Sequence, residues 1–78
     1  MLEKTTKIVF EGKCVVEGVE IASSRTTINL DDPTDIPEFY HRRIDDEACK
    51  ANRAVLRADQ AAFEDSVYEF QENVLANL

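Results

Sequence analysis

The residues of this sequence that could take part in catalysis or bind a metal are few and widely spaced. His41 is the single histidine, and Cys14 and Cys49 lie too far apart to match the ligand spacing of a zinc site. Cys49 neighbours Lys50, but nothing else near it indicates an activated nucleophile. We therefore expect His41 to be a surface residue and Cys14 to be a small core residue.

Carboxylates gather at two places, and neither place has the spacing of a known site. Asp31, Asp32 and Asp35 superficially resemble a calcium loop, but they lack the ligand spacing and the glycine of an EF-hand. The acidic run at residues 45–47 would point in different directions from a helix. The sequence also contains no phosphate-binding loop, dinucleotide motif or nucleophile elbow. We predict no cofactor, no metal and no enzymatic activity.

The N-terminal part of the chain is predicted to form an antiparallel β-hairpin. Apolar and polar side chains alternate over residues 4–16, which is the period of a strand with one buried face. Glu17 and Gly18 follow, with glycine in the second turn position, where a positive φ is needed. A tight turn there pairs Val16 with Val19. Glu is a poor first residue for such a turn, so a longer loop stays open.

Along the second strand, the apolar positions expected to be buried change from odd-numbered to even-numbered residues. Ile21 is odd-numbered and Ile28 is even-numbered, and a phase shift of one residue is typical of a β-bulge. We place the bulge at residues 23–25, which brings Ile28 opposite Ile8. A tight turn would also bring Cys14 opposite Ile21.

The C-terminal half is the longest uniform segment. Residues 38–78 contain no glycine or proline and are rich in good helix formers. Asp35 followed by Glu38 fits a capping box, so we predict one α-helix over residues 38–77. Its apolar stripe changes near residue 59, which leaves a bend or a helical hairpin there as the alternative.

These elements define the predicted fold class, which is α+β. A chain of 78 residues is near the lower limit for a self-sufficient core. We expect one small domain over residues 1–78, made of an N-terminal antiparallel β-hairpin in 1–32, a turn in 33–37 and one long C-terminal α-helix in 38–77.

The lengths of the two elements predict an interface. A helix of roughly 40 residues is about 60 Å long, whereas the hairpin reaches about 40 Å at most. One apolar stripe of the helix would therefore lie bare, and bare stripes usually mark an interface. We expect a homo-oligomer, with a dimer favoured, held through Leu56, Phe63, Val67, Phe70 and Val74.

The formal net charge of −7 argues against nucleic-acid binding, which needs a basic surface. From Asp59 onward the chain contains acidic residues and no basic residue. That acidic run is either a solvated helix face or a surface for a basic partner. No apolar run is long enough to span a membrane, and residues 1–7 lack the apolar core of a secretory signal, so we expect no membrane contact and a cytoplasmic location.

Three short segments carry a resemblance to a known group of proteins. They are residues 7–13 (KIVFEGK), 50–53 (KANR) and 61–68 (AAFEDSVY). They resemble small acidic proteins encoded in prophages of Gram-positive bacteria, often among head and tail genes. The resemblance implies an accessory or assembly role within a larger phage or host protein assembly, in the bacterial host cell or in the virion. That group is largely uncharacterised, so the resemblance assigns no functional residue.

Two classes of function follow from these features. The first is a non-enzymatic structural or assembly protein that acts through self-association and protein–protein contacts. The second is a small acidic regulator or inhibitor that binds a basic surface of a host protein. The bare apolar stripe favours the first class, and the acidic C-terminal third would serve the second.

Overall fold

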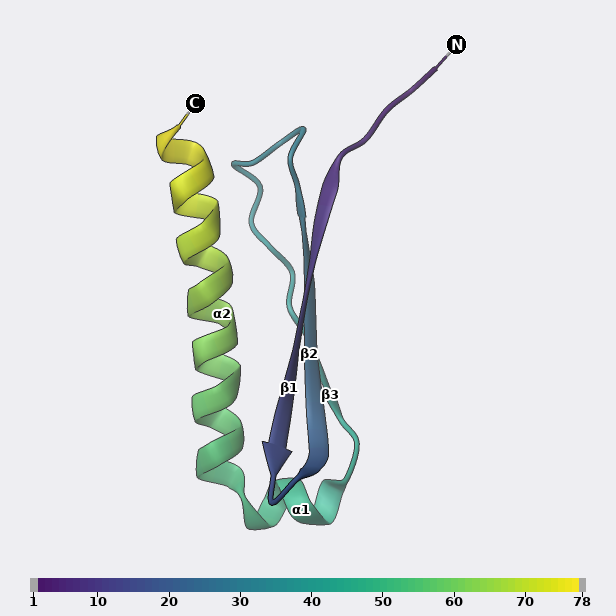
Figure 1. Ribbon diagram of the computed structural model, residues 1–78, viewed down its shortest axis with the longest axis vertical. Coiled ribbons are helices and arrows are strands. Elements are labelled where there is room, and N and C mark those ends of the chain that lie inside the picture. Colours follow the sequence, from purple (N-terminus) through teal and green to yellow (C-terminus); the bar gives the residue numbers. More distant parts are fainter. Residues whose placement is uncertain (1, 78) are drawn as a thin grey trace.

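The chain folds into a three-stranded antiparallel sheet with one long helix packed along a single face (Figure 1). The computed structural model describes residues 2–77. Its elements in chain order are strands β1 (Lys7–Val16), β2 (Val19–Asn29) and β3 (Tyr40–Arg43), followed by helices α1 (Asp46–Ala51) and α2 (Arg53–Ala76). The predicted α+β class, with an N-terminal hairpin and a long C-terminal helix, is confirmed.

Strands β1 and β2 form the hairpin, and the tight turn between them is confirmed. Glu17 has φ 51° and Gly18 has φ 79°, the two positive values that a two-residue turn of type I′ requires. Val16 pairs with Val19 at the turn. At the far end Ile8 pairs with Ile28, as the alternation of the two strands predicts.

The β-bulge exists, but its predicted position at residues 23–25 is wrong. The register shifts where Cys14 pairs with Ala22 and Val15 pairs with Glu20, so the extra residue is Ile21. Because of the bulge, Ile21 and Ala22 both face the core, and each is only 2% exposed. The expected pairing of Cys14 with Ile21 is wrong for the same reason.

The predicted helix over residues 38–77 is wrong at its N-terminal end. Residues 40–43 form β3, which pairs with the second edge of β2, and Ser24 lies opposite His41. A central strand needs hydrogen-bond partners on both edges, and this non-local demand overrides the helix propensity of the segment. The Ile21 carbonyl at the bulge then accepts bonds from the N–H groups of Ile44 (2.9 Å) and Asp45 (3.2 Å).

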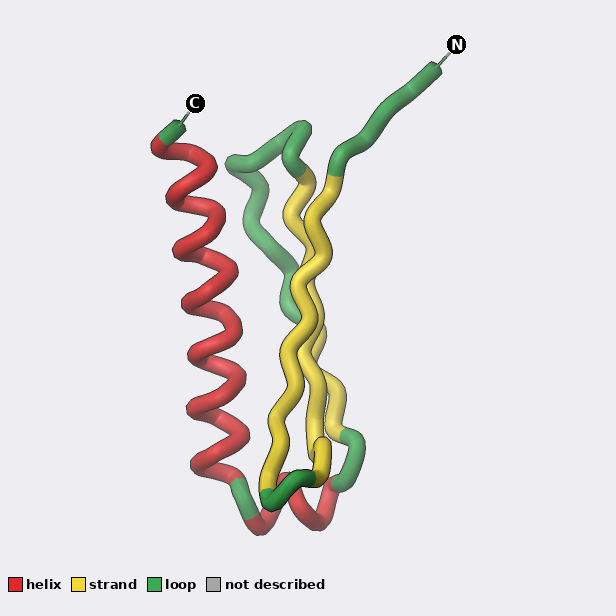
Figure 2. Tube along the Cα trace, viewed as in Figure 1, coloured by secondary structure: helices red, strands yellow, loops and turns green. Residues whose placement is uncertain are grey.

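Helix formation begins at Asp46, and Asp35 with Glu38 does not cap a helix. The N-cap is Asp45, whose side chain accepts a 3.1 Å bond from the N–H of Ala48. The helical segment then breaks at Asn52, between α1 and α2, as Figure 2 shows. Helix α2 is continuous from Arg53 to Ala76, so the predicted continuity through residue 59 is confirmed and the alternative of a bend or helical hairpin there is not found.

Helix α2 packs on the sheet through the stripe of side chains that recurs every three or four residues. Val67 at its centre is 0% exposed. Phe70 packs edge-on against Phe10 of β1, with ring centroids 5.3 Å apart. Gln71 is buried and donates to the carbonyls of Pro33 (2.9 Å) and Asp35 (2.6 Å), which fastens the β2–β3 loop to the helix.

Gly12 lies at the closest approach between β1 and α2. A Cβ atom at this position would lie 2.7 Å from Cδ2 of Phe63, well inside contact distance. The ring of Phe63 also packs against Phe39, with centroids 6.1 Å apart, and so has little freedom to move aside. The missing side chain of Gly12 therefore makes room for α2 at this point.

Gly12→Ala should lower the free energy of unfolding by about 1–3 kcal/mol, because the new methyl group overpacks the contact with Phe63. In a Phe63→Leu background the same substitution should cost much less. Urea denaturation of the four proteins in this cycle provides the measurement. An equal cost of Gly12→Ala in both backgrounds would show that Phe63 does not limit this position.

Candidate protein-interaction surface

A chain of three polar side chains joins β2, β3 and α2. The Oγ of Ser24 lies 2.8 Å from Nδ1 of His41, and Nε2 of His41 lies 2.9 Å from Oε1 of Glu64. The partners are 17 and 23 residues apart in sequence, so no local pattern marks them. His41 is a surface residue, as expected, but its side chain is only 25% exposed and has two hydrogen-bond partners.

These three residue types also occur in nucleophilic triads, but the site around Ser24 does not suit such chemistry. Ser24 lies inside β2, where it pairs with Gly12 on one side and with His41 on the other. The backbone groups of this stretch are used by the sheet, so they do not form an oxyanion hole beside Oγ. The Ser24–His41–Glu64 chain instead fixes β3 and α2 relative to β2.

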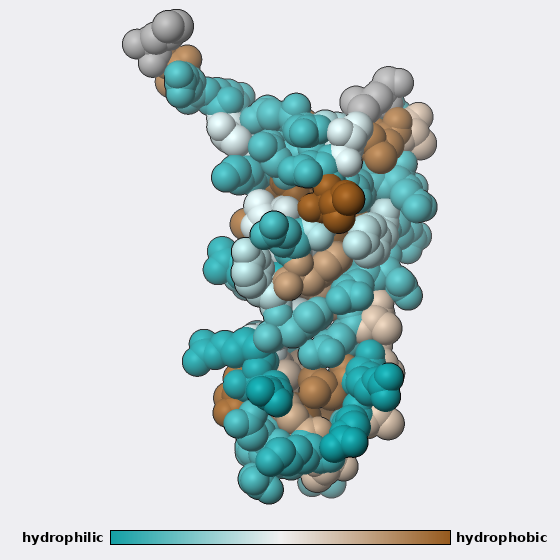
Figure 3. All heavy atoms as spheres, turned by 180° about the vertical axis from the view of Figure 1, so that it is seen from behind, coloured by the Kyte–Doolittle hydropathy of each residue, from teal (hydrophilic) through white to brown (hydrophobic). Residues whose placement is uncertain are grey.

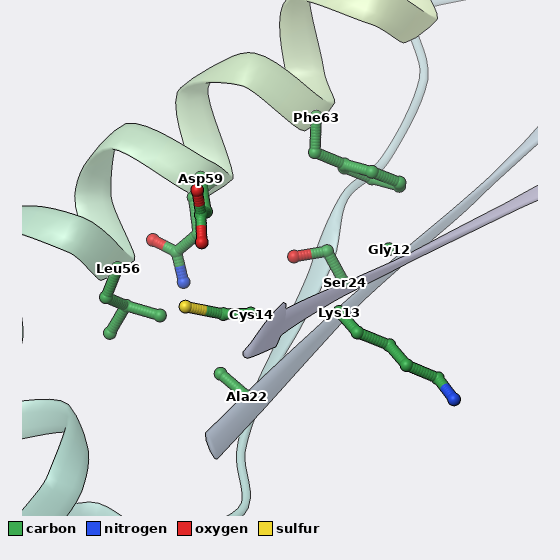
Figure 4. A pocket seen from close by; sticks show the side chains of 9 residues that line it. Gly12, Lys13, Cys14, Ala22, Ser24, Leu56, Asp59 and Phe63 are labelled. Atoms are coloured by element: carbon green, nitrogen blue, oxygen red, sulfur yellow. The ribbon is translucent and has the colours of Figure 1, made fainter. Parts of the chain in front are cut away.

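Beside the Ser24, His41 and Glu64 side chains, a partly open cavity of about 170 Å³ lies between the sheet and α2. Figure 4 shows the Cys14 sulfur pointing from β1 toward Leu56 and Asp59 of α2, with Phe63 above Gly12. Burial, together with the carboxylate of Asp59, raises the pKa of the Cys14 thiol from 9.0 to about 11. The thiolate is the reactive form of cysteine, so this site suppresses nucleophilic chemistry.

Both thiols belong to the core. Cys14 lies on the buried face of β1, as the alternation predicts, and Cys49 of α1 is 4% exposed. The Cys49 thiol donates to the Ile21 carbonyl at 3.3 Å, which ties α1 to the bulge. Within residues 2–77 no group of three His, Cys, Asp or Glu side chains could hold a metal ion.

The residues of the predicted helix interface are buried or partly buried within their own chain, where Leu56, Phe63 and Phe70 pack against the sheet. Helix α2 has 24 residues and is about 36 Å long, which matches the 11 residues of β2 at about 35 Å. The expectation that the helix is much longer than the hairpin is therefore wrong, because part of the expected helix forms β3 and α1 instead. Within this chain Val67 is buried, and the partly buried residues of the predicted interface are Leu56, Phe63, Phe70 and Val74.

The outer face of the sheet, opposite α2, also carries exposed apolar side chains. Val9 is 47% exposed and Val15 is 51% exposed. Charged residues lie among them in cross-strand pairs. Lys13 Nζ lies 3.8 Å from Glu20, and Arg25 Nε lies 4.0 Å from Glu11.

The two edges of the sheet differ in how well they are protected. The β3 edge is four residues long and contains His41, Arg42 and Arg43, and short, charged edge strands resist pairing with other chains. Figure 3 views the molecule from the β3 side and shows a predominantly hydrophilic surface with separated apolar patches. The β1 edge is ten residues long, and no strand within residues 2–77 pairs with it.

The hydrogen-bonding groups on the β1 edge follow from the register. Leu30 donates from its N–H to the carbonyl of Thr6 at 2.8 Å, so this pair is a hydrogen-bonded pair of the antiparallel ladder. Such pairs recur at every second residue, so the even-numbered residues of β1 bond to β2. The N–H and C=O groups of the odd-numbered residues point away from β2, and these residues are Lys7, Val9, Glu11, Lys13 and Val15.

Comparison with protein-family models, with curated proteins and with solved structures finds no match to this chain. Among residues 2–77 no helix is both long enough and apolar enough to cross a lipid bilayer. Geometry alone marks the candidate interaction surface, which is the β1 edge left unpaired among the described residues, with the outer face beside it.

The raised pKa of Cys14 predicts a pH dependence of stability. The unfolded thiol ionises near pH 9 and the folded thiol near pH 11, so the contribution of this group is complete below pH 9. It should be lost as the pH rises toward 11, at up to about 1.4 kcal/mol per pH unit. Urea unfolding across this range should show the decline in the native protein and a flatter profile in Cys14→Ala. Parallel profiles would contradict the burial of this thiol.

Proposed function

We propose that this protein is a non-enzymatic assembly accessory of phage type, which acts through self-association and contacts with other proteins. The observation that supports this function is the unpaired β1 edge, ten residues long, in a sheet of only three strands. An exposed edge of this length is a template for strand addition by another chain. The phage context comes from the resemblance of residues 7–13, 50–53 and 61–68.

Small size also supports self-association. Only six apolar residues among those described are buried in the core. A domain of this size has little stability of its own, and oligomerisation is a common remedy. Strand addition at β1 would satisfy the free backbone groups of that edge and cover Val9 and Val15.

One observation favours the alternative function, in which the protein is an acidic regulator that binds a basic host protein. Three acidic side chains of α2, those of Asp65, Glu69 and Glu72, are exposed to solvent. Attraction between opposite surface charges weakens steeply with salt, because the screening length is about 8 Å at physiological ionic strength. Capture of a basic host protein that is lost in moderate salt, by a protein that remains a monomer, would favour this alternative.

The native protein should sediment as a dimer or larger oligomer at concentrations on the order of tens of micromolar. Val9→Pro should shift it to monomers, because proline removes an N–H that points outward from β1 and leaves the β1–β2 ladder intact. Val9→Thr is the matched control, since it keeps both the N–H and the branched shape. A monomeric native protein, or a Val9→Pro protein that still associates, would contradict association through β1.

A further inference from the structure

We propose that the partner at the β1 edge is a second copy of this chain, paired antiparallel through β1 about a two-fold axis at Gly12. This inference rests on the proposed self-association and specifies its register. It joins the two sheets into one continuous sheet of six strands. Opposed residues of an antiparallel pair share a face, so both α2 helices lie on the same side of that sheet.

The charges along β1 favour this register over its near neighbours. With the axis at Gly12, Glu11 lies opposite the partner's Lys13, and Lys13 lies opposite the partner's Glu11. The same pairing sets Val9 opposite the partner's Val15, so the exposed valines of the outer face cover each other. Opposite charges and β-branched pairs across strands are both favourable.

Neighbouring registers bring like charges together. An axis at Glu11 sets Glu11 opposite the partner's Glu11, and an axis at Lys13 sets Lys13 opposite the partner's Lys13. An axis at Phe10 sets Lys7 opposite the partner's Lys13. Registers that pair odd-numbered with even-numbered residues fail for another reason, because the outward-pointing groups of one strand would meet residues whose groups point toward β2.

The backbone hydrogen bonds agree with the same axis. An axis at Gly12 pairs odd-numbered residues only with odd-numbered residues, and these are the residues whose N–H and C=O groups are free. Gly12 itself then forms a non-hydrogen-bonded pair with the partner's Gly12, at a Cα separation of about 4.5 Å. Such a close pair suits a residue without a side chain.

The helices fit this arrangement. Helix α2 contacts both β1 and β2, so its axis lies roughly one strand spacing, about 4.8 Å, from the two-fold axis. Two such helices would lie about 10 Å apart, which is within the usual range for packed helices. Phe63 lies over Gly12, so the two Phe63 rings approach each other at the axis. Nearby, the small residues Ala62 and Ser66 permit close contact between the helices.

A charge-swap cycle tests this register. Glu11→Lys and Lys13→Glu each convert both inter-chain ion pairs into like-charge pairs, and each should weaken the dimer about tenfold. The double variant restores opposite charges across the axis, because the new lysine of each chain faces the new glutamate of the other. Its dissociation constant should return to within a few-fold of the native value. Sedimentation equilibrium measures all four proteins, and circular dichroism checks that each is folded.

If only the ion pairs within one chain mattered, the four proteins would follow the opposite order of stability. Glu11 lies near Arg25 and Lys13 lies near Glu20, so the double variant loses both intra-chain pairs and would be the weakest protein if those alone mattered. The native protein could be a dimer while the double variant has a dissociation constant no lower than those of the single variants. That result would overturn the Gly12 register and leave the proposed self-association intact. A monomeric native protein overturns the proposed register and the proposed self-association together.

Discussion

The structure depends on the need of β2 for hydrogen-bond partners along both of its edges. The hairpin satisfies one edge, and residues 40–43 satisfy the other. The bulge at Ile21 turns a carbonyl toward Ile44 and Asp45, which ends β3 and places the cap of α1. Helix α1 crosses the end of the hairpin, and the break at Asn52 sends α2 back along the sheet (Figure 1). Each later element therefore takes its position from the central strand.

The sequence predicts those parts of the fold that depend on neighbouring residues. The Glu17-Gly18 turn, the pairing of Ile8 with Ile28 and the burial of Cys14 follow from local alternation and turn chemistry. Strand β3 could not be predicted in this way, because residues 40–43 become a strand only when β2 offers its edge. A local signal did exist for the start of α1. Asp45 precedes an acidic first turn and a basic last turn, which is the pattern of a capped helix.

Neither the hydrogen-bonded series Ser24–His41–Glu64 nor the free β1 edge could be predicted from the sequence, and the reasons differ. The Ser24–His41–Glu64 chain joins three elements that are distant in sequence, so it appears only in the folded molecule. The free edge of β1 depends on strand order, which places β3 beside β2 and leaves β1 outermost. Residues 38–45 belong to β3 and its flanking loops rather than to the expected helix, and the break at Asn52 shortens α2 further until it matches the hairpin. Because α2 is shorter than expected, the candidate interface lies on the sheet and not on the helix.

Amide hydrogen exchange along β1 tests the central claim, that this edge is the surface of association, most directly. The N–H groups of even-numbered residues such as Phe10 and Gly12 bond to β2 and should be protected at every protein concentration. The N–H groups of Val9, Glu11 and Lys13 should be unprotected in dilute solution and become protected as the concentration rises. Odd-numbered amides that exchange freely at all concentrations, in a protein that sediments as an oligomer, would contradict association through this edge.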